Sequence, residues 1–320
     1  MIKCLAAFVS LFCAVSTAFP QGLLQVQEVR RASAYGYVHA EDFSDVDDDG
    51  FNIPASQQDA SDSATATAGG STSTVEVDAG NANPFNGQGC ASDAETTVTL
   101  KAGPEGYVTS EGSGTGYYEK QFQVVGVPAA GKTFVIAGVI EVAADGDLMA
   151  SASAGMEQSL SCSVMNGEMP DEVTVPYDVC GGIPDPWKPK ADTGELTVYF
   201  KRAIAPGAKF WVYSSADAGT SSYESSTDPN QITLNGYADA YISISVIQVD
   251  NADIRMRDFK YRFDENGDID GEPEVTDHGG SDCDEDDEYL ISDYEDGDYE
   301  DGYGDYEDYE AGYEDYEGAY

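Results

Sequence analysis

Strand-like residue patterns run through most of this chain, and no stretch shows a helical period. Turn residues such as Pro206-Gly207 and Asn235-Gly236 separate these strand-like segments. In Tyr241–Val246 apolar and polar residues alternate strictly, which is typical of a half-buried strand. We therefore expect an all-β chain with one antiparallel β-sandwich, jelly-roll-like, over residues 75–263. Its expected strands are 96–100, 117–127, 132–142, 172–179, 195–204, 209–215, 240–249 and 254–263.

The C-terminal stretch, residues 264–320, holds 26 Asp and Glu residues and no Lys or Arg. Like charges repel, and the stretch has almost nothing aliphatic to bury, so we expect a disordered, solvated polyanion. The remaining chain is also acidic, with 34 Asp and Glu residues against 15 Lys and Arg. A negative field of this size repels nucleic acid and anionic lipid, so we expect neither nucleic acid nor a membrane as a partner.

The first 31 residues carry processing signals. Residues 1–18 have a basic start at Lys3, a short apolar run and small residues at the end, which predicts a secretory signal peptide and a secreted protein. Residues 19–31 end in Arg30-Arg31 and fit either a propeptide or an exposed arm. Residues 32–74 are acidic, then rich in Ser, Thr and Ala, and we expect a flexible arm there.

Four cysteines follow the signal peptide, and an even number in an oxidising compartment predicts two disulfides. We favour Cys162–Cys180, which closes a short loop, and Cys90–Cys283, which ties the two ends of the folded region together. Four cysteines allow three pairings, so the spacing alone does not decide between them.

Calcium is the cofactor that the carboxylates suggest. Asp45, Asp47 and Asp49 precede Gly50 as in the first half of an EF-hand loop, but position 12 is Ser56. A second partial match has Asn266, Asp268 and Asp270, with Asp277 at position 12. Each fits either a solvated Asp-rich turn or a weak Ca²⁺ site, with a Kd of ~10⁻⁴–10⁻³ M. We also expect weak cation binding by the run Asp284, Glu285, Asp286, Asp287 and Glu288.

Nine tyrosines lie between Tyr289 and Tyr320, most of them beside carboxylates. They fit sulfation in the secretory pathway, oxidative cross-linking in a matrix or stacking on a partner, and the alternative is a merely solubilising tail. The candidates for sulfation or cross-linking are Tyr294, Tyr299, Tyr306, Tyr309, Tyr313 and Tyr316.

Catalysis has little support in the sequence. His39 and His278 lie outside the predicted core, so Ser-His and Cys-His arrangements lack a base, and we do not expect an enzyme. Aromatic residues at strand positions are more often core than sugar-binding platforms. We accordingly expect a core position for Trp187, Tyr199, Phe200, Phe210, Trp211 and Tyr213.

The signal peptide, the modest folded domain and the acidic run from Asp282 to Glu288 together resemble the acidic proteins of calcified skeletons and shells. This chain differs from the most extreme of them, which are dominated by poly-Asp, because Tyr and Gly interrupt its acids. The resemblance implies an extracellular matrix protein that binds calcium, adsorbs to a growing mineral surface and contacts cationic matrix proteins. The alternative is a secreted β-sandwich binding module for a carbohydrate or protein, with a solubilising or tyrosine-sulfated tail.

Overall fold

The structure is a computed structural model, and it describes residues 22–40, 43–53, 60–68, 71–80, 88–101, 108–157, 159–219, 224–226 and 230–283. These residues form antiparallel β-strands and two single-turn 3-10 helices, η1 (Asp185–Trp187) and η2 (Asn251–Asp253). The expected all-β class is therefore confirmed. Within the described ranges, no helix is long and apolar enough to cross a membrane.

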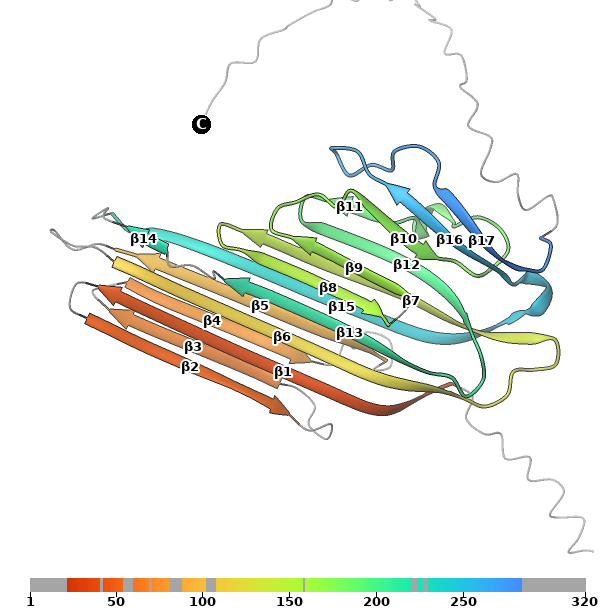
Figure 1. The fold of residues 1–320 in the computed structure, drawn as a ribbon, viewed down its shortest axis with the longest axis horizontal. Coiled ribbons are helices and arrows are strands. Elements are labelled where there is room, and N and C mark those ends of the chain that lie inside the picture. The colour runs from red at the N-terminus through yellow and green to blue at the C-terminus, as the bar shows by residue number, and fades with distance from the viewer. Residues whose placement is uncertain are drawn as a thin grey trace, which may run out of the picture.

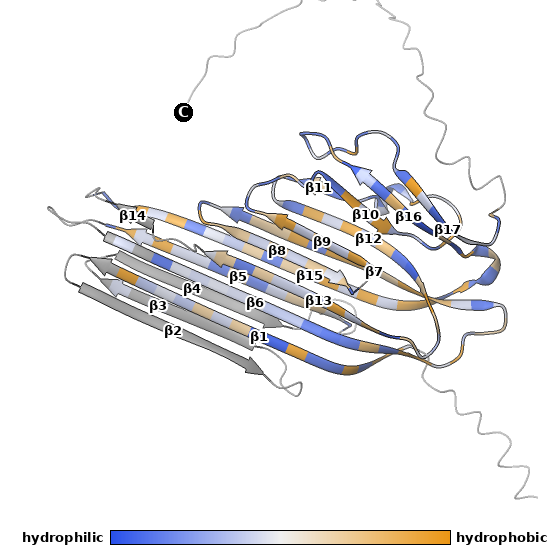
Figure 2. Cartoon of the chain, in the orientation of Figure 1, coloured by the Kyte–Doolittle hydropathy of each residue, from blue (hydrophilic) through white to orange (hydrophobic). Residues whose placement is uncertain are grey.

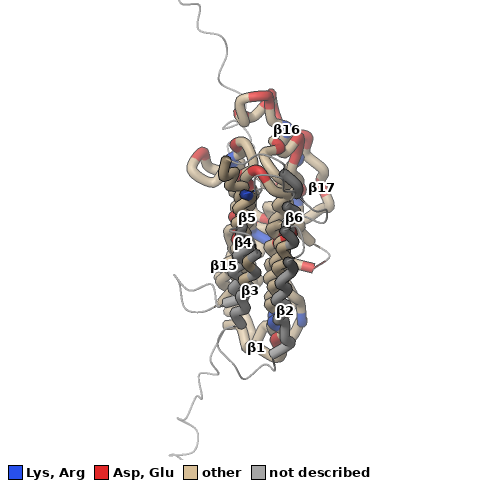
Figure 3. The backbone as a smooth tube through the Cα atoms, turned by 90° about the vertical axis from the view of Figure 1, so that its left-hand side faces the viewer, with Lys and Arg blue, Asp and Glu red and all other residues tan. Residues whose placement is uncertain are grey.

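Two large sheets lie face to face (Figure 1), and the view edge-on shows them as two layers (Figure 3). The first, sheet A, has the strand order β2-β1-β6-β13-β8-β9, and β14 also pairs with β6. Its strands are β1 (Gly22–Ala40), β2 (Phe43–Ile53), β6 (Val108–Val125), β8 (Ala150–Met156), β9 (Leu160–Met165), β13 (Lys209–Gly219) and β14 (Glu224–Ser226).

The second large sheet, sheet B, has the order β11-β12-β7-β15-β5-β4-β3. Its strands are β3 (Ala60–Ala68), β4 (Ser71–Gly80), β5 (Gly89–Leu100), β7 (Lys132–Gly146), β11 (Lys190–Asp192), β12 (Glu195–Ile204) and β15 (Ile232–Asp250). A third, smaller sheet C has the order β10-β16-β17, with β10 (Glu172–Pro176), β16 (Arg255–Arg262) and β17 (Glu274–Gly280). Sheet C is joined to β12 by a bridge between Tyr177 and Lys201.

Small side chains fill the interior between β5 and β13. Ser92 Oγ lies 2.8 Å from Ser214 Oγ, and Thr96 Oγ1 donates a hydrogen bond to the Ala218 carbonyl at 2.9 Å. Both pairs are separated by 122 residues, so the two strands run in the same direction and stay in register across the interior. Cα atoms of the two strands come within 8 Å of each other, whereas stacked sheets usually lie ~10 Å apart.

Larger apolar side chains fill the interior toward sheet C. Alternate positions over much of β6, β12 and β15 are buried, as period-2 alternation predicts, whereas Phe134, Val135 and Ile136 of β7 are buried in succession. Sheet C joins this cluster through Val173, Val175, Phe259 and Tyr261, and the neighbouring strands β7, β9 and β12 carry apolar bands between polar ones (Figure 2). Phe200 and Phe210 belong to the core as expected, whereas Trp187, Tyr199, Trp211 and Tyr213 are only half-buried.

The described strands include β1 to β4, which begin upstream of the expected boundary at Val75, and that boundary is thereby corrected. β1, β2, β3 and part of β4 occupy most of the stretch 32–74, for which we expected a flexible arm. Ala32 and Ala34 are buried at alternate positions of β1, so the alternation here is between small residues. Ala and Gly have too little hydrophobic contrast to reveal a strand in the sequence, but they fit a closely packed sheet interior.

The expectation of an exposed arm in residues 19–31 is corrected too, because residues 22–31 belong to β1. Arg30 is buried, and a cut after Arg31 would divide the strand between positions paired with Tyr117 and Gly116. Residues 22–31 are therefore part of sheet A rather than an exposed arm, and the alternative of a propeptide stays a prediction. The predicted signal peptide, residues 1–18, lies outside the described residues.

A cluster of charged side chains is buried on the inner face of sheet A, on the neighbouring strands β1 and β6. Glu28 Oε1 lies 3.0 Å from Arg30 Nη2, and both side chains are almost completely buried. Tyr118 donates its hydroxyl proton to Glu28 Oε2 at 3.0 Å. The guanidinium of Arg30 and the ammonium of Lys120 lie 4.6 Å and 4.8 Å from the centre of the Tyr118 ring. Burial lowers the pKa of Lys120 and raises that of Tyr118.

Candidate functional site: the acidic end of the sandwich

Acidic residues gather at the end of the sandwich where β16 and β17 lie (Figure 3). The segment from Asp253 to Cys283 contributes ten Asp and Glu residues and only four Lys and Arg. Four of its carboxylates occupy alternate positions, and all are exposed: Asp268, Asp270, Glu272 and Glu274. Gly271, within this stretch, has a φ of +75°, so the chain bends there instead of holding the four carboxylates along one extended face.

Asp264 organises the loop that carries Asn266, Asp268 and Asp270. Its Oδ1 accepts the backbone N–H groups of Asn266 at 2.8 Å and of Asp268 at 3.0 Å. Chiefly the Asn266 N–H bond holds the pKa of Asp264 below its usual range. Gly267 has a φ of +82°, and a Cβ there would lie 2.2 Å from the Ala191 carbonyl oxygen. The loop is therefore a compact turn that leaves the three predicted ligands on its outside.

Asp277, the fourth residue of that partial EF-hand match, has other partners. It lies in β17, where its Oδ2 accepts from Arg255 Nε at 2.7 Å, with Arg255 Nη2 also at 2.7 Å. Its Oδ1 accepts the Gly279 N–H at 2.7 Å, and this bond is the main reason why the pKa of Asp277 is lowered. Within the described ranges, no group of three or more His, Cys, Asp and Glu side chains converges as metal ligands would.

The first partial EF-hand match is a strand. Asp45, Asp47 and Asp49 lie in β2 and pair with Val38, Gly36 and Ala34 of β1. An EF-hand loop must turn sharply at its sixth position, and extended backbone does not, which corrects the expected loop. The residues Asp284 to Glu288 and the six candidate tyrosines from Tyr294 to Tyr316 lie outside the described residues, so their predicted roles stay predictions.

The disulfide pairing also differs from the expected one. Cys180 is bonded to Cys283, with Cα atoms 5.5 Å apart, while Cys90 and Cys162 are free and buried. Cys162 points inward from β9, and burial raises the pKa of its thiol to about 12. Cys90 points inward from β5 and donates to the Val212 carbonyl at 3.6 Å. Both cysteines face the interior from their own strands, so neither meets the partner that we expected. Spacing along the chain does not reveal these strand positions.

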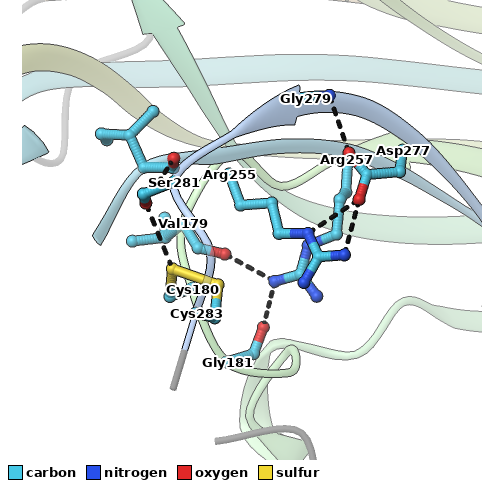
Figure 4. Close-up of polar contacts among 10 residues, drawn as sticks. Val179, Cys180, Gly181, Arg255, Arg257, Asp277, Gly279, Ser281 and Cys283 are labelled. Carbon is cyan, nitrogen blue, oxygen red and sulfur yellow. Dashed lines mark hydrogen bonds and ion pairs between the residues drawn. A yellow bond between two sulfur atoms is a disulfide. The ribbon is translucent and has the colours of Figure 1, made fainter. Parts of the chain in front are cut away.

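Several contacts fix the chain on both sides of this disulfide (Figure 4). Arg257 Nη2 donates to the carbonyls of Val179 at 2.7 Å and Gly181 at 2.6 Å, which flank Cys180. Ser281 Oγ and the Ser281 N–H both donate to the Ile254 carbonyl, at 2.9 Å and 2.8 Å. Cys283 is bonded to Cys180, so the acidic sequence that follows it starts from a covalently fixed point.

A second polar network crosses sheet C and includes residues that the sequence did not single out. His278 Nε2 lies 2.6 Å from Asp258 Oδ2, and Arg202 Nη1 lies 3.3 Å from Asp258 Oδ1 and 3.6 Å from the buried Asp178. Burial raises the pKa of Asp178, against the lowering effect of the Ala203 N–H and Arg202. The sequence predicts His278 in a solvated tail; it lies instead in β17 and belongs to this network.

The outer face of sheet B is acidic as well. Asp93 of β5 is directly opposite Asp239 of β15, and Glu95 is opposite Tyr237. Burial, then the charge and hydrogen bond of Asp239, raise the pKa of Tyr237 to about 12. Burial also raises the pKa of Asp239. Carboxylates therefore repel one another across neighbouring strands here, although no ligand geometry singles out a binding site.

Comparisons with known proteins found no matching family model, curated protein or solved structure. The site can therefore be interpreted only from its own geometry and chemistry.

Proposed function

We propose that this chain is a secreted acidic structural protein that binds Ca²⁺ and calcium-bearing mineral surfaces through its C-terminal carboxylates. The observation that supports this most is the position of Cys283. The disulfide fixes it to Cys180 just after β17, so the 18 acids of residues 284–320 directly continue the acidic segment 264–282.

Binding of this kind needs no single high-affinity site. Carboxylates favour Ca²⁺ as hard oxygen ligands, and extracellular sites work with a Kd of ~10⁻⁴–10⁻³ M. Many weak contacts on one chain add through effective concentration, which suits adsorption to a lattice of cations. The Cys180–Cys283 disulfide is consistent with an oxidising, extracellular location. Cationic matrix proteins are further partners of such a surface.

Adsorption to calcium-salt crystals tests the proposal. A full-length variant with Asp284, Glu285, Asp286, Asp287 and Glu288 changed to amides should adsorb several-fold less, because charge adjoining the acidic end is lost. The matched control removes five exposed charges from the outer face of sheet B: Asp93, Glu95, Glu141, Asp145 and Glu195. The control should adsorb almost as well as the original chain. Equal losses in both variants would mean that only net charge matters and would contradict the proposal.

A carbohydrate-binding module is the second candidate, because Trp211 and Tyr213 lie at outward-facing, half-buried positions of β13. Their rings are two residues apart on one face of sheet A, where sugar rings could stack. Trp187 is less suited, since Tyr199 packs against its ring at 5.7 Å and the Lys201 ammonium lies 4.6 Å from its centre. Retention on an insoluble polysaccharide that is lost in Trp211→Ala and needs no Ca²⁺ would favour this candidate.

A further inference from the structure

A pocket of about 500 Å³ opens between the η1 loop and the turn that follows β16. Its lining is mostly apolar: Ile183, Pro184, Phe259, Tyr261, Ile269 and Pro273. Phe259 and Tyr261 are core residues of sheet C, so the floor of the pocket is rigid. Three charged side chains, Asp185, Lys188 and Glu272, also contribute to the lining, and Asp185 pairs with Lys188 at 2.8 Å. The lining as a whole suits an apolar or aromatic group rather than an ion.

The chain after Cys283 starts close to this pocket. Gly182, which lines it, follows Cys180 by two residues. The Cα atoms of Cys180 and Cys283 are 5.5 Å apart, and two further Cα steps add at most ~7.6 Å. Cys283 is thus within about 13 Å of the pocket wall. Arg257 holds the carbonyl of Gly181 at 2.6 Å, which fixes the wall relative to the disulfide.

Residues 284–320 contain one short apolar cluster, Tyr289-Leu290-Ile291. Leu290 and Ile291 are the only aliphatic residues there larger than alanine. Tyr289 is six Cα steps from Cys283, and an extended chain of that length spans up to about 20 Å. The cluster can therefore reach the edge of the pocket that Gly182 forms.

We propose that Tyr289-Leu290-Ile291 of the same chain binds in this pocket, which goes beyond the proposed cation binding and does not depend on it. The short tether gives the cluster an effective concentration of about 1 mM at the pocket. Burial of Leu and Ile side chains against Ile183, Phe259 and Ile269 drives the contact. Docking fixes residues 284–288 along the surface and leaves the tyrosine-rich remainder, from Ser292 onward, free to meet a partner.

Hydrogen exchange on the full-length protein tests this inference. In the Leu290→Ser/Ile291→Ser variant, the amides of residues 182–188 and 269–273 should exchange up to about tenfold faster than in the original chain. If the cluster binds the pocket with an intrinsic Kd of about 0.1 mM, an effective concentration of about 1 mM keeps the pocket about ten times more often occupied than empty. The matched control, Tyr313→Ser/Tyr316→Ser, changes two residues far along the same acidic segment and should leave those amides unchanged. Unchanged exchange in the Leu290/Ile291 variant would overturn the inference.

A synthetic peptide with the sequence of residues 284–292 provides the reciprocal test. It should bind the full-length Leu290→Ser/Ile291→Ser variant, whose pocket is vacated, at least severalfold more tightly than it binds the original chain. Equal binding to both chains, or binding to neither, would overturn the inference. Both experiments can be made without Ca²⁺. A negative result in them would therefore not contradict the proposed cation binding, and absence of Ca²⁺ binding would not contradict the docking.

Discussion

Changing Cys180 and Cys283 together to serine is expected to lower the free energy of unfolding by about 4–5 kcal/mol. The bond joins residues 103 apart in sequence, and closing a loop of about 100 residues restricts the unfolded chain by roughly 4.7 kcal/mol in the chain-entropy model. The bond also joins the chain just before Gly181 to the chain just after β17, so its loss should loosen sheet C first. Urea unfolding, followed by tryptophan fluorescence, measures the difference.

The matched control for this experiment is Cys90→Ala, which removes a buried thiol that is not in a disulfide. It should cost much less, because only a small side chain and one weak hydrogen bond are lost. Reduction of the original chain should lower its stability by about as much as the double substitution does. A peptide map that found Cys162 bonded to Cys180 would contradict the structure directly.

Changing Glu28 to alanine is expected to lower the free energy of unfolding by about 3–5 kcal/mol, the usual cost of breaking a buried ion pair from one side. The substitution leaves Arg30 without the carboxylate 3.0 Å away, and it removes the acceptor of the Tyr118 hydroxyl. Lys120, buried nearby over the same ring, loses the attraction of the Glu28 charge. Thermal and urea unfolding both report this loss.

The exposed pair between Lys132 and Asp250, at 3.3 Å, supplies the comparison. Asp250→Ala should change stability by less than about 1 kcal/mol, since exposed ion pairs contribute little. Glu28→Gln keeps an acceptor for Tyr118 but removes the charge, and should fall between the two. Similar losses in Glu28→Ala and Asp250→Ala would show that the group between β1 and β6 is hydrated rather than buried.

Alternation of apolar and polar residues predicted the strands after Val75 because their inward positions carry large side chains such as Phe134, Phe200 and Ile242. It failed for β1 because the inward positions there are Glu28, Arg30, Ala32 and Ala34. A strand whose inward positions are charged or small has the same residue pattern as an exposed linker. Only the facing sheet, with its own small or polar residues, explains why these positions are buried.

The site was less predictable than the fold. The composition shows that the C-terminal region is acidic, but it does not show how far into this region the folded strands extend. Residues 264–283 form a turn and a strand, although the sequence predicts a disordered polyanion there. Asp264 and Asp277 accept backbone N–H groups, and these hydrogen bonds stabilise the turn and the end of the strand. The pairing of Cys180 with Cys283 depends on sheet C bringing both together, and the partners of His278 and Asp258 depend on the pairing of β16 with β17.

Calorimetric Ca²⁺ titration, at ~0.15 M salt so that nonspecific attraction is screened, tests the proposed function most directly. The full-length chain is compared with one that ends at Cys283, which keeps the disulfide and all described contacts. The proposal predicts several weak sites in the full-length chain, with a Kd of ~10⁻⁴–10⁻³ M, most of which disappear on truncation. The same binding in both chains, or no heat in either, would contradict it.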